Sequence, residues 1–148
     1  MADMMKRVPV AEQEPKVRAK NFEEVCLGYT EKEAMEEAVR CLNCRNPKCV
    51  VGCPVSIQIN EFIHEVKEGN FEKAAEVIAR SSALPAVCGR VCPQETQCEG
   101  VCIRGIKGEP VAIGKLERFV ADWAREHGFQ AAQAGAPNGK KVAVIGAG

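Results

Sequence analysis

The sequence predicts an all-α fold, followed by the first strand of a second domain of the α/β class. Apolar residues recur at helical spacing in four stretches between residues 30 and 127. Eight of the nine cysteines fall into two blocks that separate these stretches. The last residues, KKVAVIGAG, have the pattern of a buried parallel strand that runs into a glycine turn. A chain of 148 residues has room for one small domain and the beginning of another.

The N-terminal part is predicted to be an extended arm that lies across another surface. Residues 1–28 are polar, contain Pro9 and Pro15, and show no sustained periodicity, although a helical turn is expected around NFEEV. The first helix begins after the arm, because Thr30 and Glu33 form a capping-box pattern ahead of an apolar run. This helix is expected to present the first cysteines at its C-terminal end.

Two more helices are predicted after the first cysteine block, and a longer one after the second. Ser56 is expected to cap a helix through IQINEFIHEVKE, which ends at Gly69. Asn70 is expected to cap FEKAAEVIARSS, which stops before Pro85. The longest helix covers VAIGKLERFVADWAREH, with Gly128 just beyond its end. The IRGIKGEP stretch before it is expected to form a turn or a short hairpin.

Charge and composition argue against several kinds of partner. Lys and Arg total 20 and Asp and Glu total 20, so no field of one sign favours nucleic acid or an anionic membrane. No apolar run is long enough for a signal peptide or a membrane span, so a cytoplasmic protein is expected. The predicted divisions are an arm at 1–28, a helical domain at 29–128, a linker at 129–139 and the start of the second domain at 140–148.

The clustered cysteines form the blocks CLNCRNPKCVVGCP, which starts at Cys41, and CGRVCPQETQCEGVC, which starts at Cys88. Closely spaced thiolates can converge on one inorganic centre, and a proline after a cysteine turns the chain away and removes an amide that would need a partner. The bacterial ferredoxin run CxxCxxCxxxCP is similar in kind, although its middle gap is shorter. In that run the fourth cysteine binds the other cluster of a pair.

Three kinds of site compete to explain these thiols. Disulfides are disfavoured in a reducing compartment. Structural zinc favours paired CxxC motifs or a histidine ligand, but only Cys41 and Cys44 form a strict CxxC, and His64 and His127 lie on predicted helices away from the blocks. Two iron–sulfur clusters with four ligands each match the count best. A zinc-stabilised interaction module without a redox role is the alternative.

The two blocks, together with EQEPKVRAKNFEEVCLGYT before them and AIGKLERF after them, resemble a known family. They are similar to the N-terminal iron–sulfur domain of the glutamate synthase small (beta) subunit. The large subunit of NADH-dependent ferredoxin:NADP oxidoreductase and dihydropyrimidine dehydrogenase share this domain. The resemblance implies an alpha-helical ferredoxin domain with two [4Fe-4S] clusters, followed by FAD-binding and NADPH-binding domains of the α/β class.

The resemblance also implies which residues hold the clusters. The first cluster would take Cys41, Cys44, Cys49 and Cys102, and the second would take Cys53, Cys92, Cys98 and Glu117. Counting thiols alone favours Cys88 as the eighth ligand in place of Glu117. Cys26 has no cysteine neighbours in the sequence and is expected to be structural or incidental. Five basic residues are expected either to offset cluster charge or to be solvated surface: Arg40, Arg45, Lys48, Arg90 and Arg104.

The C-terminal GxG, Gly146 and Gly148, is similar to the opening of a dinucleotide-binding fingerprint. The third glycine and the acidic ribose ligand are missing, so FAD binding is expected only in the complete parent. The resemblance implies that NADPH reduces FAD in that parent and that the clusters pass electrons between FAD and a partner subunit. Such a partner would be a glutamate synthase large subunit or a ferredoxin-linked flavoprotein. No catalytic residue is expected in this chain.

Overall fold

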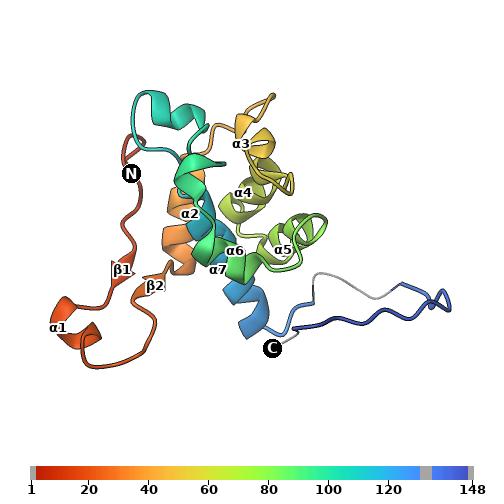
Figure 1. Ribbon diagram of the computed structural model, residues 1–148. Helices are drawn as coiled ribbons and strands as arrows, with labels where there is room; N and C mark the ends of the chain where they lie inside the picture. The colour runs from red at the N-terminus through yellow and green to blue at the C-terminus, as the bar shows by residue number, and fades with distance from the viewer. Residues whose placement is uncertain (1–2, 131–134, 147–148) are drawn as a thin grey trace.

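The computed structural model describes residues 3–130 and 135–146, and four helices surround its apolar core (Figure 1). The longest helix, α7, packs against the others and against a shorter helix, α6, that lies beside it. Because these helices leave both cysteine blocks at one end of the bundle, they determine where the thiols meet (Figure 1). The four core helices are α2 (Glu31–Val39), α4 (Ile59–Lys67), α5 (Phe71–Ala79) and α7 (Ile113–Glu126).

The predicted start of the first helix is confirmed. The Thr30 hydroxyl accepts a hydrogen bond from the Glu33 amide, and the Glu33 carboxylate accepts one from the Thr30 amide at 2.8 Å. Ala34 and Ala38 lie four residues apart on one face and are fully buried. This face turns α2 towards α4 and α7, so the end of α2 delivers the first cysteine block to the bundle.

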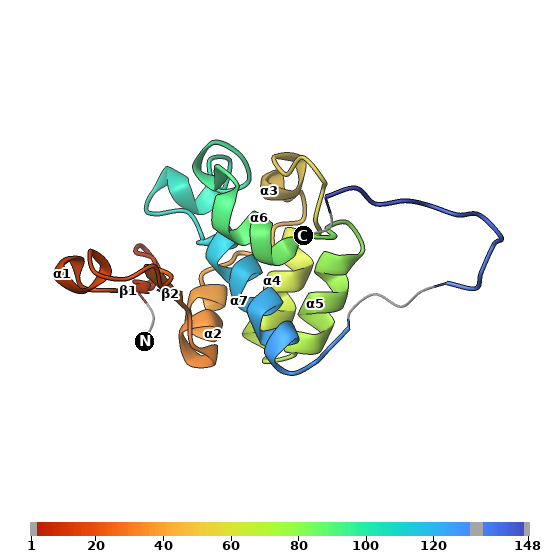
Figure 2. The ribbon, with the colours of Figure 1, turned by 60° about the horizontal axis from the view of Figure 1, so that its bottom comes forward.

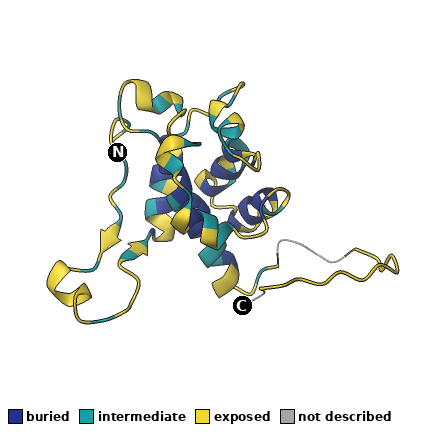
Figure 3. Ribbon diagram, viewed as in Figure 1, coloured by how far each residue is buried: buried dark blue, intermediate teal, exposed yellow. Residues whose placement is uncertain are grey.

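The few aromatic residues gather in one place in the core. The ring of Phe71 on α5 meets the ring of Phe119 on α7 edge-to-face, with centroids 5.1 Å apart, and it contacts Trp123 at 5.3 Å. Aliphatic side chains of α4 and α7 fill the rest of the interior, and their burial is visible in Figure 3. The cysteine segments pack against the edge of this core, and the Cys98 side chain is buried in it.

Several short helices were not expected from the sequence. They are α3 (Lys48–Val51), α6 (Pro85–Val91), and the 3₁₀ turns η1 (Gln94–Thr96) and η2 (Ile103–Ile106), all within or beside the cysteine blocks. Periodicity cannot reveal helices of three to seven residues. The helix predicted to stop before Pro85 does so, since α5 ends at Ala79, and Pro85 then occupies the first turn of α6, where its missing amide costs nothing.

Two predicted caps differ from the structure. Ser56 has a positive φ of 54° and lies in the turn before α4, so α4 begins after Gln58 instead. Asn70 precedes α5, but its side chain donates to Glu65 at 3.0 Å and does not cap the helix. The predicted left-handed residues at the ends of α4 and α7 are confirmed: Gly69 and Gly128 have φ of 76° and 64°.

The N-terminal arm is partly folded. Strand β1 (Ala11–Glu12) pairs antiparallel with β2 (Cys26–Gly28), and the segment between them projects from the bundle (Figures 1 and 2). The only helix described in this segment is α1 (Pro15–Arg18), so the helical turn expected around NFEEV is wrong; Pro15 starts a helix earlier in the chain. The guanidinium of Arg118 on α7 donates to the Cys26 carbonyl at 2.8 Å and anchors the hairpin.

The C-terminal residues do not form the buried strand that their pattern predicts. Residues 135–146 are exposed and belong to no helix or strand. A parallel strand needs neighbouring strands for its hydrogen bonds, and the described residues supply none at this end. Gly146 has a positive φ of 81°, whereas Gly148 lies outside the described residues. Within the parts of the chain that the structure describes, no helix is both long and apolar enough to cross a membrane.

Candidate metal centre

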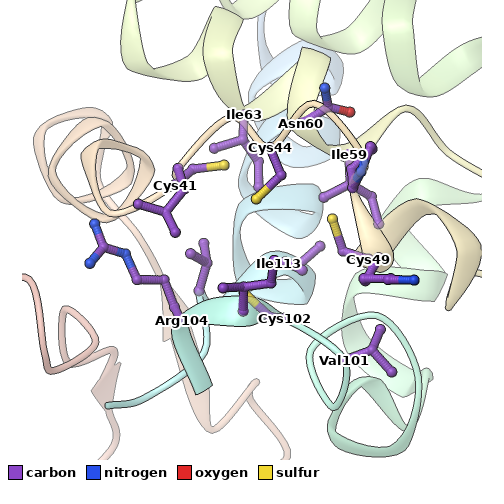
Figure 4. Close-up of a pocket in the computed structure, with 15 residues that line it drawn as sticks. Cys41, Cys44, Cys49, Ile59, Asn60, Ile63, Val101, Cys102, Arg104 and Ile113 are labelled. Atoms are coloured by element: carbon purple, nitrogen blue, oxygen red, sulfur yellow. The ribbon is translucent and has the colours of Figure 1, made fainter. Parts of the chain in front are cut away.

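Four thiols from both cysteine blocks line a single cavity at the end of the bundle. They are Cys41, Cys44, Cys49 and Cys102, and Figure 4 shows their side chains around one space. The cavity has a volume of about 30 Å³. Its remaining wall is largely apolar, with Ile59 and Ile63 from α4 and Ile113 from α7. These four residues are the set that the family resemblance implies for the first cluster.

Local structure explains how the first three thiols reach this cavity. Cys41 follows the end of α2, and Asn43 then adopts a positive φ of 46°, which reverses the chain before Cys44. The Asn43 amide lies 3.5 Å from the Cys41 sulfur and donates to it. Cys49 lies within α3. The nine residues from Cys41 to Cys49, at the turn between α2 and α3, therefore place three sulfurs on the side of the chain that faces the cavity.

The electrostatics of this set favour neutral thiols in the absence of a cation. Burial raises the pKa of Cys41, and burial together with the neighbouring Cys102, Cys41 and Cys44 raises the pKa of Cys49 to about 11. Thiolates are the metal-binding form, so a bound cation has to offset both effects. In residues 3–130 and 135–146, no three Cys, His, Asp or Glu side chains are close enough to hold a single metal ion. The four thiols instead line one cavity.

A second group of candidate ligands lies where α6 meets α7. Burial, together with the nearby Glu99, Cys53 and Glu117, raises the pKa of Cys98 to about 12. Burial also raises the pKa of Cys92, with contributions from Cys88, Glu117 and Cys53. Cys53 and Glu117 therefore lie near enough to Cys92 and Cys98 to affect the pKa of both thiols. Cys88 lies beside Cys92 as well, so both candidates for the eighth ligand are present.

Glu117 has the features of a ligand rather than of a solvated surface residue. It is 7% exposed, and burial raises the pKa of its carboxyl group to about 7. Its Oε1 atom is buried and makes no hydrogen bond with any of the described residues. A buried polar atom without a partner is costly, and coordination of a metal would satisfy it. This unpartnered oxygen is the observation that favours Glu117 as a metal ligand.

Cys26 lies apart from both sets, as expected. Its sulfur is 3.6 Å from the Nζ atom of Lys115 on α7. Among the basic residues near the blocks, Arg90 forms ion pairs with Glu24 and Asp122, both at 2.7 Å. Arg90 therefore serves to tie the N-terminal hairpin to the bundle, because Glu24 belongs to the hairpin and Asp122 to α7.

Sequence reasoning missed a buried ionic network behind the first thiol set. Glu37 and Arg40 on α2 are 0% exposed and form an ion pair. The Glu37 carboxylate also accepts hydrogen bonds from the amides of Val8 and Ala112, at 2.7 and 2.8 Å. The sequence does contain an indication that Glu37 is buried, because Glu37 lies three residues after Ala34 on the apolar face of the helix.

This network joins the two cysteine blocks to the N-terminal segment. The Arg40 guanidinium donates to the Glu109 carbonyl, and Arg104 Nε donates to the Arg40 carbonyl at 2.6 Å. Glu99, next to Cys98, accepts from the Gly114 amide at 3.0 Å and pairs with Arg7. The backbone on either side of Cys41, Cys98 and Cys102 is fixed in this way.

Helices α6 and α7 touch at Gly89, which has no room for a side chain. A Cβ atom at Gly89 would lie 2.6 Å from the Arg118 amide nitrogen and 2.8 Å from its Cα. We expect Gly89→Ala to separate the two helices and to lower the free energy of unfolding by about 1–3 kcal/mol, as overpacking does. The change should also alter the spectroscopic signal of the second set, because Cys92 follows α6 and Glu117 lies on α7.

Gly105→Ala is the matched control for this prediction, because the atoms nearest to its new Cβ lie at an ordinary contact distance of 3.7 Å. Chemical denaturation and electron paramagnetic resonance (EPR) of both variants provide the measurement. Equal stability of the two variants would show that the close approach at Gly89 is not required.

Comparison with known proteins identifies the family of the chain. Residues 18–129 match the family described as dihydropyrimidine dehydrogenase domain II, 4Fe-4S cluster. The chain is 40% identical over 145 residues to the glutamate synthase [NADPH] small chain of Escherichia coli K12, which covers 97% of the chain and 31% of that protein. It is also 40% identical over 127 residues to the Escherichia coli NAD-dependent dihydropyrimidine dehydrogenase subunit PreT, covering 86% of the chain and 31% of the relative.

A glutamate synthase small chain from Halomonas elongata gives a similar result, with 40% identity over 147 residues. The chain spans about a third of the length of these relatives, 31% in each case. The matched region contains both cysteine blocks and α7, which carries Glu117. The chain belongs to the 4Fe-4S cluster family of dihydropyrimidine dehydrogenase domain II, as the iron–sulfur domain of glutamate synthase small-chain and PreT-like oxidoreductases.

Proposed function

We propose that the chain binds two [4Fe-4S] clusters and carries electrons between the FAD of its parent flavoprotein and a partner subunit. The observation that supports this most directly is the cavity lined by Cys41, Cys44, Cys49 and Cys102. These residues come from two blocks far apart in the sequence, and four thiols around one space match the ligand requirement of one cluster. The second cluster would be held by Cys53, Cys92, Cys98 and Glu117.

Glu117 is preferred over Cys88 as the eighth ligand on two grounds. Its carboxylate influences both Cys92 and Cys98, and its buried Oε1 lacks a partner among the described residues. The Cys88 thiol already interacts with the neighbouring thiol of Cys92, and Cys88 is only partly buried, so it does not need a metal to satisfy it. A carboxylate ligand would also change the charge and the potential of the second cluster.

When bound, the clusters would supply one-electron transfer, which needs no general acid or base from the protein. The residues of the chain fix the sulfurs, limit access of water and set the surrounding polarity. Ile59, Ile63 and Ile113 supply the apolar wall of the first site. In the parent, NADPH would reduce FAD, and the partner subunit would be of the glutamate synthase large-subunit type.

Iron and sulfide analysis of an anaerobically purified sample tests the proposal. We expect about eight irons and eight sulfides per chain, broad visible absorption and two EPR signals after reduction. A colourless protein with stoichiometric zinc would contradict the proposal and favour an interaction module without a redox role. A full-length parent that reduces a pyrimidine in place of forming glutamate would keep the clusters but assign a dihydropyrimidine dehydrogenase.

The eighth ligand can be identified by a pair of variants. Glu117→Ala is expected to disturb the EPR signal of one cluster and to lower the iron content, while Cys88→Ala leaves both unchanged. Glu117→Gln is a useful third variant, since it keeps the shape of the side chain and one oxygen donor. If Cys88→Ala disturbs the signal and Glu117→Ala does not, the second cluster has four cysteine ligands.

A further inference from the structure

The two segments that surround the first thiol set carry positive charge and no negative charge. Residues 41–60 contain Arg45 and Lys48 but no Asp or Glu, and residues 100–108 contain Arg104 and Lys107 but no Asp or Glu. The chain as a whole has 20 basic and 20 acidic residues, so the positive excess at this end is balanced elsewhere. The asymmetry coincides with the end of the bundle that holds the thiols.

Apolar side chains form the centre of the same surface. Leu42, Val101 and Ile103 line the mouth of the thiol cavity and are 50%, 45% and 42% exposed. Lys48 and Arg104 line the cavity beside them. We call this surface the basic face; it consists of Leu42, Lys48, Val101, Ile103 and Arg104, together with the exposed Arg45, which follows the cavity-lining Cys44 in the chain.

The cations of the basic face are not used in ion pairs within the described chain. Among residues 3–130 and 135–146, no carboxylate pairs with Arg45, Lys48 or Arg104. The arginines that stabilise the fold, such as Arg90 and Arg118, do pair with carboxylates. Arg104 donates to a backbone carbonyl and keeps its charge uncompensated.

We propose that the basic face docks a protein that carries a one-electron redox group behind an acidic surface. The inference rests on the proposed electron-transfer function and adds the location and the charge of the docking site. An apolar centre with a charged rim is the usual anatomy of a transient interface. Charge of one sign at the rim speeds the encounter with an opposite partner and repels a like-charged one. The cavity at its centre would bring the partner within electron-transfer range of the first cluster.

The same cations have another possible role, which is to offset the negative charge of the cluster. The two roles predict different results. If the cations offset the negative charge of the cluster, their removal would change the potential of the cluster and its reaction with every acceptor, including a small neutral one. Docking would change only the reaction with charged protein acceptors, and the change would weaken as salt screens the charges.

The test uses the full chain with its clusters reconstituted and reduced by dithionite. Stopped-flow absorption measures the transfer of one electron to plant plastocyanin, which is acidic, and to mitochondrial cytochrome c, which is basic. Both acceptors have high potentials. A small neutral quinone reports on the cluster alone. We expect a rate constant at low salt at least tenfold higher for plastocyanin than for cytochrome c, with the advantage lost at high salt.

Charge reversal locates the effect on the surface. In the double variant Arg45→Glu and Lys48→Glu, the rate with plastocyanin should fall about tenfold at low salt. The rate with the quinone should stay unchanged. The control is Lys73→Glu, which makes the same type of change at an exposed position on α5. The proposal would be overturned if the rate with plastocyanin fell equally in the control and the double variant. It would also be overturned if the rate with the quinone fell as much as the rate with plastocyanin.

Cross-linking gives a second readout that does not depend on electron transfer. A carbodiimide joins a lysine amine to a carboxylate only where the two are in contact. With plastocyanin, we expect cross-links from Lys48 and none from Lys73, and cross-links from Lys73 alone would overturn the proposal. A sample without iron would instead refute the proposed function. Intact clusters with no dependence on acceptor charge would refute only the docking site.

Discussion

Replacing Glu37 by alanine is expected to lower the free energy of unfolding by about 3–5 kcal/mol, the usual cost of breaking a buried ion pair from one side. The variant leaves the fully buried guanidinium of Arg40 without its carboxylate. It also removes the acceptor for the amides of Val8 and Ala112. Both losses occur where α2, the N-terminal segment and the start of α7 meet, so the first thiol set should be disturbed together with the fold.

Anaerobic denaturation of the iron-loaded chain measures this effect. The control is Glu61→Ala, which breaks an exposed ion pair with Arg80 on the same bundle and should cost less than about 1 kcal/mol. Glu37→Gln keeps one acceptor oxygen and can accept from only one of the two amides, so its stability should fall between those of the other two variants. If Glu37→Ala and Glu61→Ala are equally stable, the buried network does not support the metal centre.

The second large effect is expected when iron and sulfide are removed. The amide hydrogens of the two cysteine segments, residues 41–58 and 88–108, should then exchange faster with solvent. The reason is that few apolar contacts support these segments without a metal. Many of their apolar side chains are exposed; Val51, Val91 and Ile106 are examples. Buried thiols with raised pKa values would gain little from staying in place once the cation has gone.

Hydrogen exchange with mass spectrometry, segment by segment, tests this expectation. The interior of α4 and α7 is the internal control, since Phe62 and Leu116 are fully buried in the apolar core. Full protection of the cysteine segments in the iron-free chain, with a single cooperative unfolding transition, would show that folding does not depend on the metal. Loss of protection that begins in α4 and α7 would equally contradict the expectation.

The sequence predicts the long helices well, because periodic apolar residues report directly on burial. α2, α4, α5 and α7 were all expected, and the capping box at Thr30 is confirmed. The sequence could not predict α3, α6 or the 3₁₀ turns, because such short elements depend on contacts with the rest of the fold. Gly89 illustrates the point, since only the approach of α7 explains why it has no side chain.

The candidate site was only partly accessible from the sequence. Spacing showed that clustered cysteines belong to a metal centre, but spacing alone favoured Cys88 over Glu117. The grouping of Cys102 with the first block came from the family resemblance, and the structure places its side chain in the same cavity as Cys41. The ionic network was missed because a glutamate at a helical core position looks like a surface residue until its partners are known.

The shared cavity of the two blocks has a consequence for the order of events during synthesis. Roughly fifty residues separate Cys49 from Cys102, and a ribosome needs about 3 to 10 s to add them. During that interval, Cys41, Cys44 and Cys49 are present on the nascent chain without the residue that completes their cavity. They are open to oxidants and to any soft metal ion in the cell. Delivery of iron and sulfide is therefore best timed after α7 has emerged, when both sets of ligands exist together.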